Sequence, residues 1–123
     1  MSQVLLYVAA GLTGLWGISH LFATKGAVAA FGDISTDNRR VITMEWITEG
    51  VALISIAAFV AVTAAIEPHA RLSTAVFAVA IAALVALALV SIFTGFRIAF
   101  LPYRLCPFIF GLSAVLIAVG AWA

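Results

Sequence analysis

Apolar residues fill four long runs of this chain, and polar residues gather in the short segments between the runs. The runs cover residues 4–22, 41–66, 72–96 and 107–122. Each is close to the length of about 20 residues that a helix needs to cross the hydrocarbon core of a membrane. The pattern therefore predicts an all-α fold, a polytopic transmembrane four-helix bundle in which residues 1–123 form a single transmembrane domain.

The composition indicates a membrane protein. Hydrophobic residues make up 66% of the chain and charged residues 9%, and the mean hydropathy is +1.27. A soluble domain of this size needs far more charge on its surface. The net charge of +1 gives no electrostatic reason to expect a nucleic-acid partner. The single cysteine, Cys106, excludes an internal disulfide and a CxxC metal or redox motif.

The segments between the runs predict where the helices begin and end. Residues 23–38 form the longest connection, and Thr36 or Asp37 is expected to cap the second helix by accepting from a first-turn N–H. Pro68 places a boundary after the second run, and Pro107 suits the first position of the last helix. The first run lacks the basic start of a signal peptide, so we expect it to be retained as a helix.

Small residues recur at helical spacing in two of the runs. The first run contains Gly11, Gly14 and Gly17, and the third contains Ala78, Ala82 and Ala86. Such residues let helix backbones approach closely in lipid, where packing replaces the hydrophobic driving force. Both sets are therefore predicted to lie at helix–helix contacts.

Basic residues are distributed unevenly between the two ends of the predicted bundle. One side carries Lys25, Arg39, Arg40, Arg97 and Arg104, and the other carries only Arg71. Cytoplasmic loops carry the excess of Lys and Arg in membrane proteins. We therefore predict a multi-pass protein of the cell (inner) membrane, with the first and third loops in the cytoplasm and both termini outside.

Two carboxylates in the second run are the most informative polar residues. Glu45 and Glu49 are four residues apart, about one helical turn, so they share a helix face. A carboxylate that faces lipid costs about 2.5 kcal/mol or more, so both are expected to face the bundle interior. At 1.5 Å per residue Glu49 lies about 15 Å deeper than Arg39, which predicts a position near the middle of the bilayer.

Several other polar residues are predicted at the same end of the bundle. The candidate site for ligand binding or proton exchange comprises Glu49, Glu45, His20, Arg97, Thr94, Trp46 and Thr48. Two structural alternatives stay open: the carboxylates pair with Arg97 or Arg104, and Trp46 belongs to the aromatic belt at the membrane surface. We predict no metal site, because the paired Glu-x-x-His motifs of di-iron bundles are absent. The sequence identifies no cofactor.

Two short segments carry a resemblance to a known family. Residues 14–22, GLWGISHLF, resemble the small-residue-rich end of the first helix of DoxX-like membrane proteins. Glu49-Gly50, within residues 45–53, is similar to the glutamate and glycine pattern of that family's second helix, although residues 35–40 are more polar than the family's compact pattern. The resemblance implies a small four-helix membrane protein linked to redox or quinone-associated systems, and implies little about mechanism.

Three functions fit this pattern. The first is the binding or passage of a small lipophilic or amphipathic molecule in a polar pocket that opens toward the cytoplasm. The second is an accessory or structural subunit of a larger membrane complex, with membrane-protein partners or a second copy of the chain. The third is an isomerase with glutamate and histidine acid–base chemistry on a lipid, since sterol isomerases of the emopamil-binding fold gather similar residue types. Here both glutamates share one helix, and whether the protein is an enzyme stays open.

Overall fold

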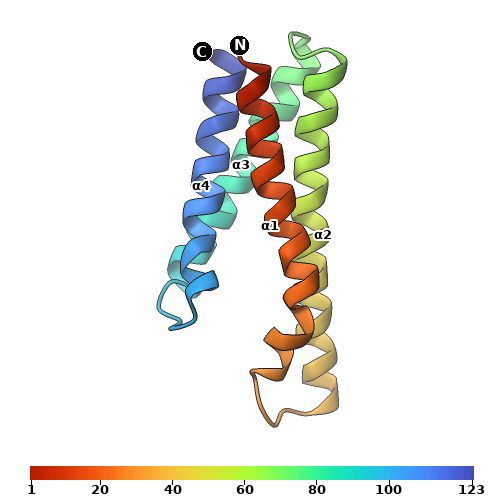
Figure 1. The fold of residues 1–123 in the computed structure, drawn as a ribbon, viewed down its shortest axis with the longest axis vertical. Helices are drawn as coiled ribbons and strands as arrows, with labels where there is room; N and C mark the ends of the chain where they lie inside the picture. Colours follow the sequence, from red (N-terminus) through yellow and green to blue (C-terminus); the bar gives the residue numbers. More distant parts are fainter.

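The structure, a computed structural model, describes every residue from Met1 to Ala123 (Figure 1). It contains four helices and no strand: α1 (Gln3–Ala29), α2 (Thr36–Ile66), α3 (Arg71–Thr94) and α4 (Leu101–Trp122). All four are long and apolar enough to cross a membrane. The predicted all-α transmembrane four-helix bundle is confirmed, and these four candidate spans indicate a multi-pass membrane protein.

The first two helices extend further than predicted. α1 continues to Ala29, so the predicted connection of residues 23–38 shrinks to residues 30–35. Residues 23–29 contain no proline, and alanine, lysine and valine among them allow the helix to continue. The cap of α2 is Ser35, whose Oγ accepts from the N–H of Asn38 at 3.1 Å, and not Thr36 or Asp37. The cap therefore precedes the predicted position.

The last helix also begins earlier than predicted. α4 starts at Leu101, and Pro107 lies inside it and not at its first position. Another proline, Pro102, occupies the first turn, where a missing N–H costs nothing because that donor has no intrahelical partner. A proline does lie at the start of the last helix, as the sequence indicated, but it is Pro102 and not Pro107.

The helices alternate in direction and form two hairpins, α1–α2 and α3–α4 (Figure 1). α1 packs on both α2 and α4, α3 packs on α4, and α2 and α3 touch least. The two hairpins therefore meet chiefly along α1 and α4. They lie close together at the end that carries both termini and diverge toward the end that carries the first and third loops (Figure 1).

Glycines bring the backbones of α1 and α2 together. A Cβ atom on Gly17 would lie 2.8 Å from the carbonyl oxygen of Gly50, and one on Gly14 would lie 3.3 Å from the Cβ of Ala57. The predicted close packing is thus confirmed for Gly14 and Gly17. It is wrong for Gly11, where an added Cβ would meet nothing within 4 Å.

The predicted alanine stripe of the third helix does not lie at a helix–helix contact. Ala78, Ala82 and Ala86 are exposed on the outside of the bundle. α3 instead buries the face formed by Ser73, Phe77, Ala80, Leu84 and Ala88. A helix this apolar on every side has no polar face to mark its outer surface, so its sequence does not fix which stripe packs inward.

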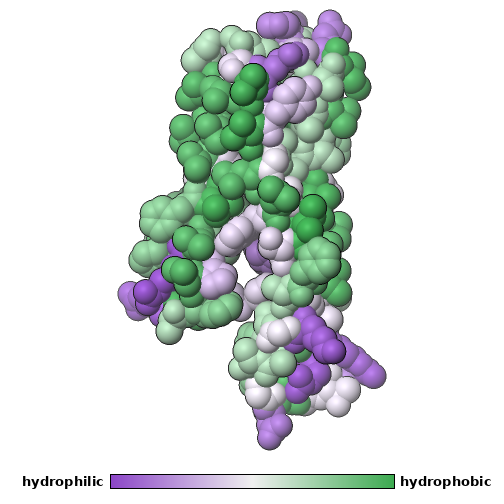
Figure 2. Space-filling model, in the orientation of Figure 1, coloured by the Kyte–Doolittle hydropathy of each residue, from purple (hydrophilic) through white to green (hydrophobic).

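The outer surface has the distribution expected of a protein in lipid. Large apolar side chains such as Phe22, Phe59 and Phe93 are mostly exposed along the sides of the bundle. Figure 2 shows apolar residues over most of the length of this face and hydrophilic residues gathered at the two ends. Because lipid tails are apolar, this exposure carries no penalty in a membrane.

Candidate functional site

His20 and Glu49 form the only ion pair between different helices. His20 Nε2 lies 3.4 Å from Oε2 of Glu49, so the pair joins α1 to α2 one turn beyond the Gly17–Gly50 contact. The His20 side chain is 9% exposed and the Glu49 side chain 41% exposed. The close glycine contact is what allows these two shorter-reaching side chains to meet.

Both ring nitrogens of His20 face oxygen atoms that only accept hydrogen bonds. Nδ1 lies 3.2 Å from the carbonyl oxygen of Trp16, and Nε2 faces the carboxylate of Glu49. A neutral imidazole has one donor nitrogen, whereas an imidazolium has two. In either form the two contacts fix the orientation of the imidazole ring between α1 and α2.

Two tryptophan rings lie beside the imidazole of His20. The rings of His20 and Trp46 lie 4.9 Å apart, between centroids, at an interplanar angle of 30°, and Trp16 meets the imidazole edge-on at 6.3 Å. Trp46 in turn contacts Tyr103 edge-on at 5.8 Å, and Tyr103 contacts Phe100 at 5.9 Å. Rings at these distances and angles attract one another through their quadrupoles. The chain of rings connects α1 and α2 to the start of α4.

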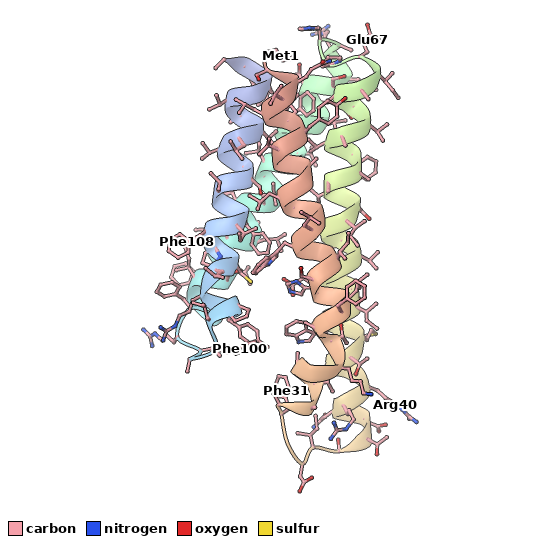
Figure 3. All side chains as sticks on the ribbon, in the orientation of Figure 1. Met1, Phe31, Arg40, Glu67, Phe100 and Phe108 are labelled. Carbon is pink, nitrogen blue, oxygen red and sulfur yellow. The ribbon has the colours of Figure 1, made fainter.

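A cavity of about 830 Å³ lies between the diverging hairpins. One wall is the lower part of α1, with Trp16, His20 and Phe31, and the other is the third loop and first turn of α4, with Phe100 and Tyr103. Figure 2 shows the opening between the two lower lobes of the molecule, and Figure 3 places Phe31 and Phe100 at the lower ends of the two hairpins. This volume lies in the range of small-molecule sites.

The cavity lies at the end of the bundle that carries the first and third loops. A hydrocarbon core of about 30 Å corresponds to about 20 residues of helix, which is the length of α2 from Trp46 to Ile66. Trp46 is level with Tyr103 at the start of α4. Glu49 lies one turn from Trp46 along α2, on the side away from Met44, and its predicted position near the middle of the bilayer stays a prediction. The first nine residues of α2, Thr36–Met44, extend beyond the level at which Trp46 meets Tyr103 of α4, and the end of α1 lies beside them (Figure 1).

The predicted site is only partly assembled. His20, Glu49 and Trp46 come together, and His20 and Trp46 line the cavity. The other four predicted residues, Glu45, Thr48, Thr94 and Arg97, are exposed and do not line it. Glu45 was expected to face the interior, but its side chain is exposed on the outside of the bundle. The Thr94 hydroxyl bonds to the carbonyl of Val90 in its own helix.

The predicted lock between the carboxylates and arginine does not form. The ion pairs are His20–Glu49 and Arg40–Asp37, and Arg104 instead donates to the carbonyl oxygen of Ile98 in the third loop. No group of three or more His, Cys, Asp or Glu residues is placed to hold a metal ion.

The predicted set left out four residues that line the cavity with an aromatic side chain: Trp16, Phe31, Phe100 and Tyr103. Trp16 carried a detectable signal, because it precedes His20 by four residues and shares its helix face. Phe31 and Phe100 carried none, because they lie in connections whose path depends on how far the helices extend. Cys106 also lines the cavity and donates to the carbonyl of Pro102 at 3.4 Å.

The chain matches no protein-family model, no curated protein sequence and no solved structure. The functional argument therefore stands on the geometry of the cavity. The walls offer flat aromatic faces for an apolar body, and the imidazole of His20, fixed by Glu49 and the Trp16 carbonyl, is the one ionisable nitrogen in the lining.

Proposed function

We propose that this protein binds a small amphipathic molecule from the membrane in the cavity between its two hairpins. The observation that carries the proposal is the position of His20, held by Glu49 in the wall of an aromatic-lined cavity of about 830 Å³. The apolar part of the ligand lies in the cavity against the rings of Trp46, Tyr103 and Phe100, and its polar part lies against the imidazole of His20. Mostly apolar walls with a few placed polar groups are the usual composition of small-molecule sites.

The location of the cavity supports a ligand that enters from the bilayer or its surface. Its walls diverge at the end of the molecule where the hairpins separate, beside the boundary marked by Trp46 and Tyr103. Trp and Tyr favour this interfacial zone because one part of each ring system is apolar and another is polar. A ligand with one apolar part and one polar part would favour the same interfacial zone.

Native mass spectrometry in mild detergent tests the proposal with a matched pair of variants. The wild-type protein should carry a bound small molecule, Glu49→Gln should lose it, and Glu45→Gln should retain it. Both substitutions remove one carboxylate from the same helix, but only Glu49 holds His20. Circular dichroism checks that both variants fold. Equal retention by the wild type and both variants, or a wild type that carries nothing, would contradict the proposal.

A second candidate function is supported by the outer face of α3. Ala78, Ala82 and Ala86 recur every four residues and are exposed, so they leave a smooth helix surface open on the outside of the bundle. Such a surface suits close packing against another transmembrane helix. The protein would then be an accessory subunit or a homo-oligomer. Replacement of Ala82 by Phe should abolish co-migration with the partner after gentle solubilisation, and an unchanged migration would rule out this surface.

Two further statements belong to the same proposal. The end with the cavity carries five of the six basic residues, so we place the first and third loops in the cytoplasm and both termini outside, in the cell (inner) membrane. The resemblance of residues 14–22 and of Glu49-Gly50 to DoxX-like proteins stays a prediction, and so does the redox or quinone-linked role that it implies. Labelling of a cysteine introduced at Ser2 from either side of the membrane tests the orientation.

A further inference from the structure

Two hydroxyl groups in the helices are buried and have no hydrogen-bond partner. Seven other serine and threonine side chains bond to the carbonyl oxygen four residues earlier in their own helix: Ser19, Thr24, Thr43, Ser55, Thr74, Ser91 and Thr94. Thr13 in α1 and Ser113 in α4 are 1% and 0% exposed, and neither hydroxyl has a hydrogen-bond partner in the protein. A buried polar group without a partner is costly, so these two hydroxyls need an explanation.

The register of α1 against α4 places the two hydroxyls opposite each other. Gly120 of α4 packs against Leu6 of α1, since an added Cβ would lie 3.1 Å from Leu6 Cγ. The helices run in opposite directions (Figure 1). Ser113 precedes Gly120 by about two turns, so it lies on the face of α4 that packs on α1. Thr13 follows Leu6 by about two turns, so it lies on the face of α1 that packs on α4.

A third buried polar atom without a partner lies one turn away on the same face of α1. Trp16 follows Thr13 by three residues, and its indole Nε1 is buried and makes no hydrogen bond of normal geometry, although the Cys106 thiol lies close to it. Thr13, Trp16 and Ser113 are the only residues with buried, unpartnered polar side-chain atoms. All three belong to the two helices through which the hairpins meet, and Trp16 also lines the cavity.

We propose that Thr13 and Ser113, with the indole of Trp16 beside them, form a binding site for water inside the bundle, between α1 and α4. Water is the occupant that fits this set of groups, because each hydroxyl both donates and accepts whereas the indole only donates. A buried water molecule makes about three hydrogen bonds, and these residues supply three groups. The site lies beyond Trp16 along α1, between the cavity and the end of the bundle that carries the termini.

Rapid hydroxyl-radical footprinting with mass spectrometry tests the site, because bound water is the source of radicals inside a protein. Phe110 is fully buried, lies one turn from Ser113 and does not line the cavity; Phe77 of α3 is equally buried and serves as the internal control. We expect oxidation of Phe110 in the wild type at a rate several-fold above that of Phe77. Equal rates for the two phenylalanines would overturn the proposal, and this comparison needs no variant.

Variants then assign the water to the hydroxyl groups. The double variant Thr13→Val, Ser113→Ala should lower the oxidation of Phe110 to the rate of Phe77, whereas Thr13→Ser, which keeps a hydroxyl, should retain it. Ser55→Ala is the matched control, because Ser55 is exposed and bonds to Val51 in its own helix. Unchanged oxidation of Phe110 in the folded double variant would place the water elsewhere and overturn the assignment to Thr13 and Ser113.

Discussion

The two ends of this bundle use the same four helices in opposite ways. At the end with the termini the hairpins are joined directly: the Met1 amino group donates to Ala123 O at 2.9 Å, and the Ser2 N–H donates to Gly120 O at 2.7 Å. Gln3 Nε2 reaches Ala64 O of α2 at 3.1 Å. At the loop end the hairpins diverge and leave the cavity (Figure 1).

Residue size explains much of this difference. Gly120 lets α4 approach the start of α1, where a Cβ would come within 3.1 Å of Ser2 O. At the loop end, the large rings of Trp16, Trp46 and Tyr103 occupy the space between the hairpins. Small residues draw helices together in lipid, and bulky residues hold them apart. The closed end therefore supplies stability, and the open end supplies the candidate site.

The largest expected effect is in the closed half. Phe77 is fully buried in α3, and Phe77→Ala should lower the free energy of unfolding by about 3 kcal/mol, because it leaves a space that the core cannot fill. Phe93→Ala in the same helix is the control, since Phe93 is 82% exposed, and its effect should stay within about 0.5 kcal/mol. Reversible unfolding in mixed micelles measures both. Equal effects would contradict the assignment of α3's inner face.

A smaller loss is expected where α1 crosses α2. Gly17→Ala should destabilise by about 1–3 kcal/mol, because its methyl group would overlap the backbone of Gly50. Gly11→Ala places a methyl group in open space and should be neutral or stabilise by up to about 1 kcal/mol through helix propensity. The same unfolding measurement distinguishes the two glycines, and a destabilising Gly11→Ala would show that this face of α1 is covered.

The His20–Glu49 pair should contribute modestly to stability. Glu49→Gln should cost no more than about 1 kcal/mol, because the carboxylate is 41% exposed and its charge is partly solvated. Glu45→Gln should have no measurable effect. A double-mutant cycle with His20→Ala isolates the coupling between the two side chains. A coupling energy of zero in that cycle would show that Glu49 does not hold His20 in place.

The smallest stability effect belongs to the open end. Phe100 is 61% exposed beside the cavity, so Phe100→Ala should change the unfolding free energy by less than about 0.5 kcal/mol. It should nevertheless speed alkylation of Cys106, the only cysteine, by a membrane-permeant maleimide, because one wall of the cavity becomes smaller. Phe108→Ala, on an exposed site of α4 outside this cavity, is the control. Equal alkylation rates in both variants would show that Phe100 does not restrict access.

The candidate site was predictable where a single helix carries the information. Glu49 and His20 stood out as ionisable residues within apolar runs, where such residues are rare. Glu45 could not be separated from Glu49 by sequence, because they share a helix face, and only the packing of α1 on α2 shows that Glu49 meets His20 while Glu45 is exposed. Thr94 and Arg97 were included in the predicted site because of their position along the third helix. Position along a helix does not determine toward which side of the helix a side chain points.

The sequence by itself determined the four helices, because lipid offers no hydrogen-bond partners and each apolar run must satisfy its backbone internally. It also indicated Gly14 and Gly17 as helix-contact residues and His20 and Glu49 as candidate site residues. Only the tertiary structure decided which face of the apolar α3 is buried, that the hairpins diverge at one end, and that the Thr13 and Ser113 hydroxyls are buried without a partner. These features depend on helix tilt and register, which follow from the packing of whole side chains between helices and leave no local pattern in the chain.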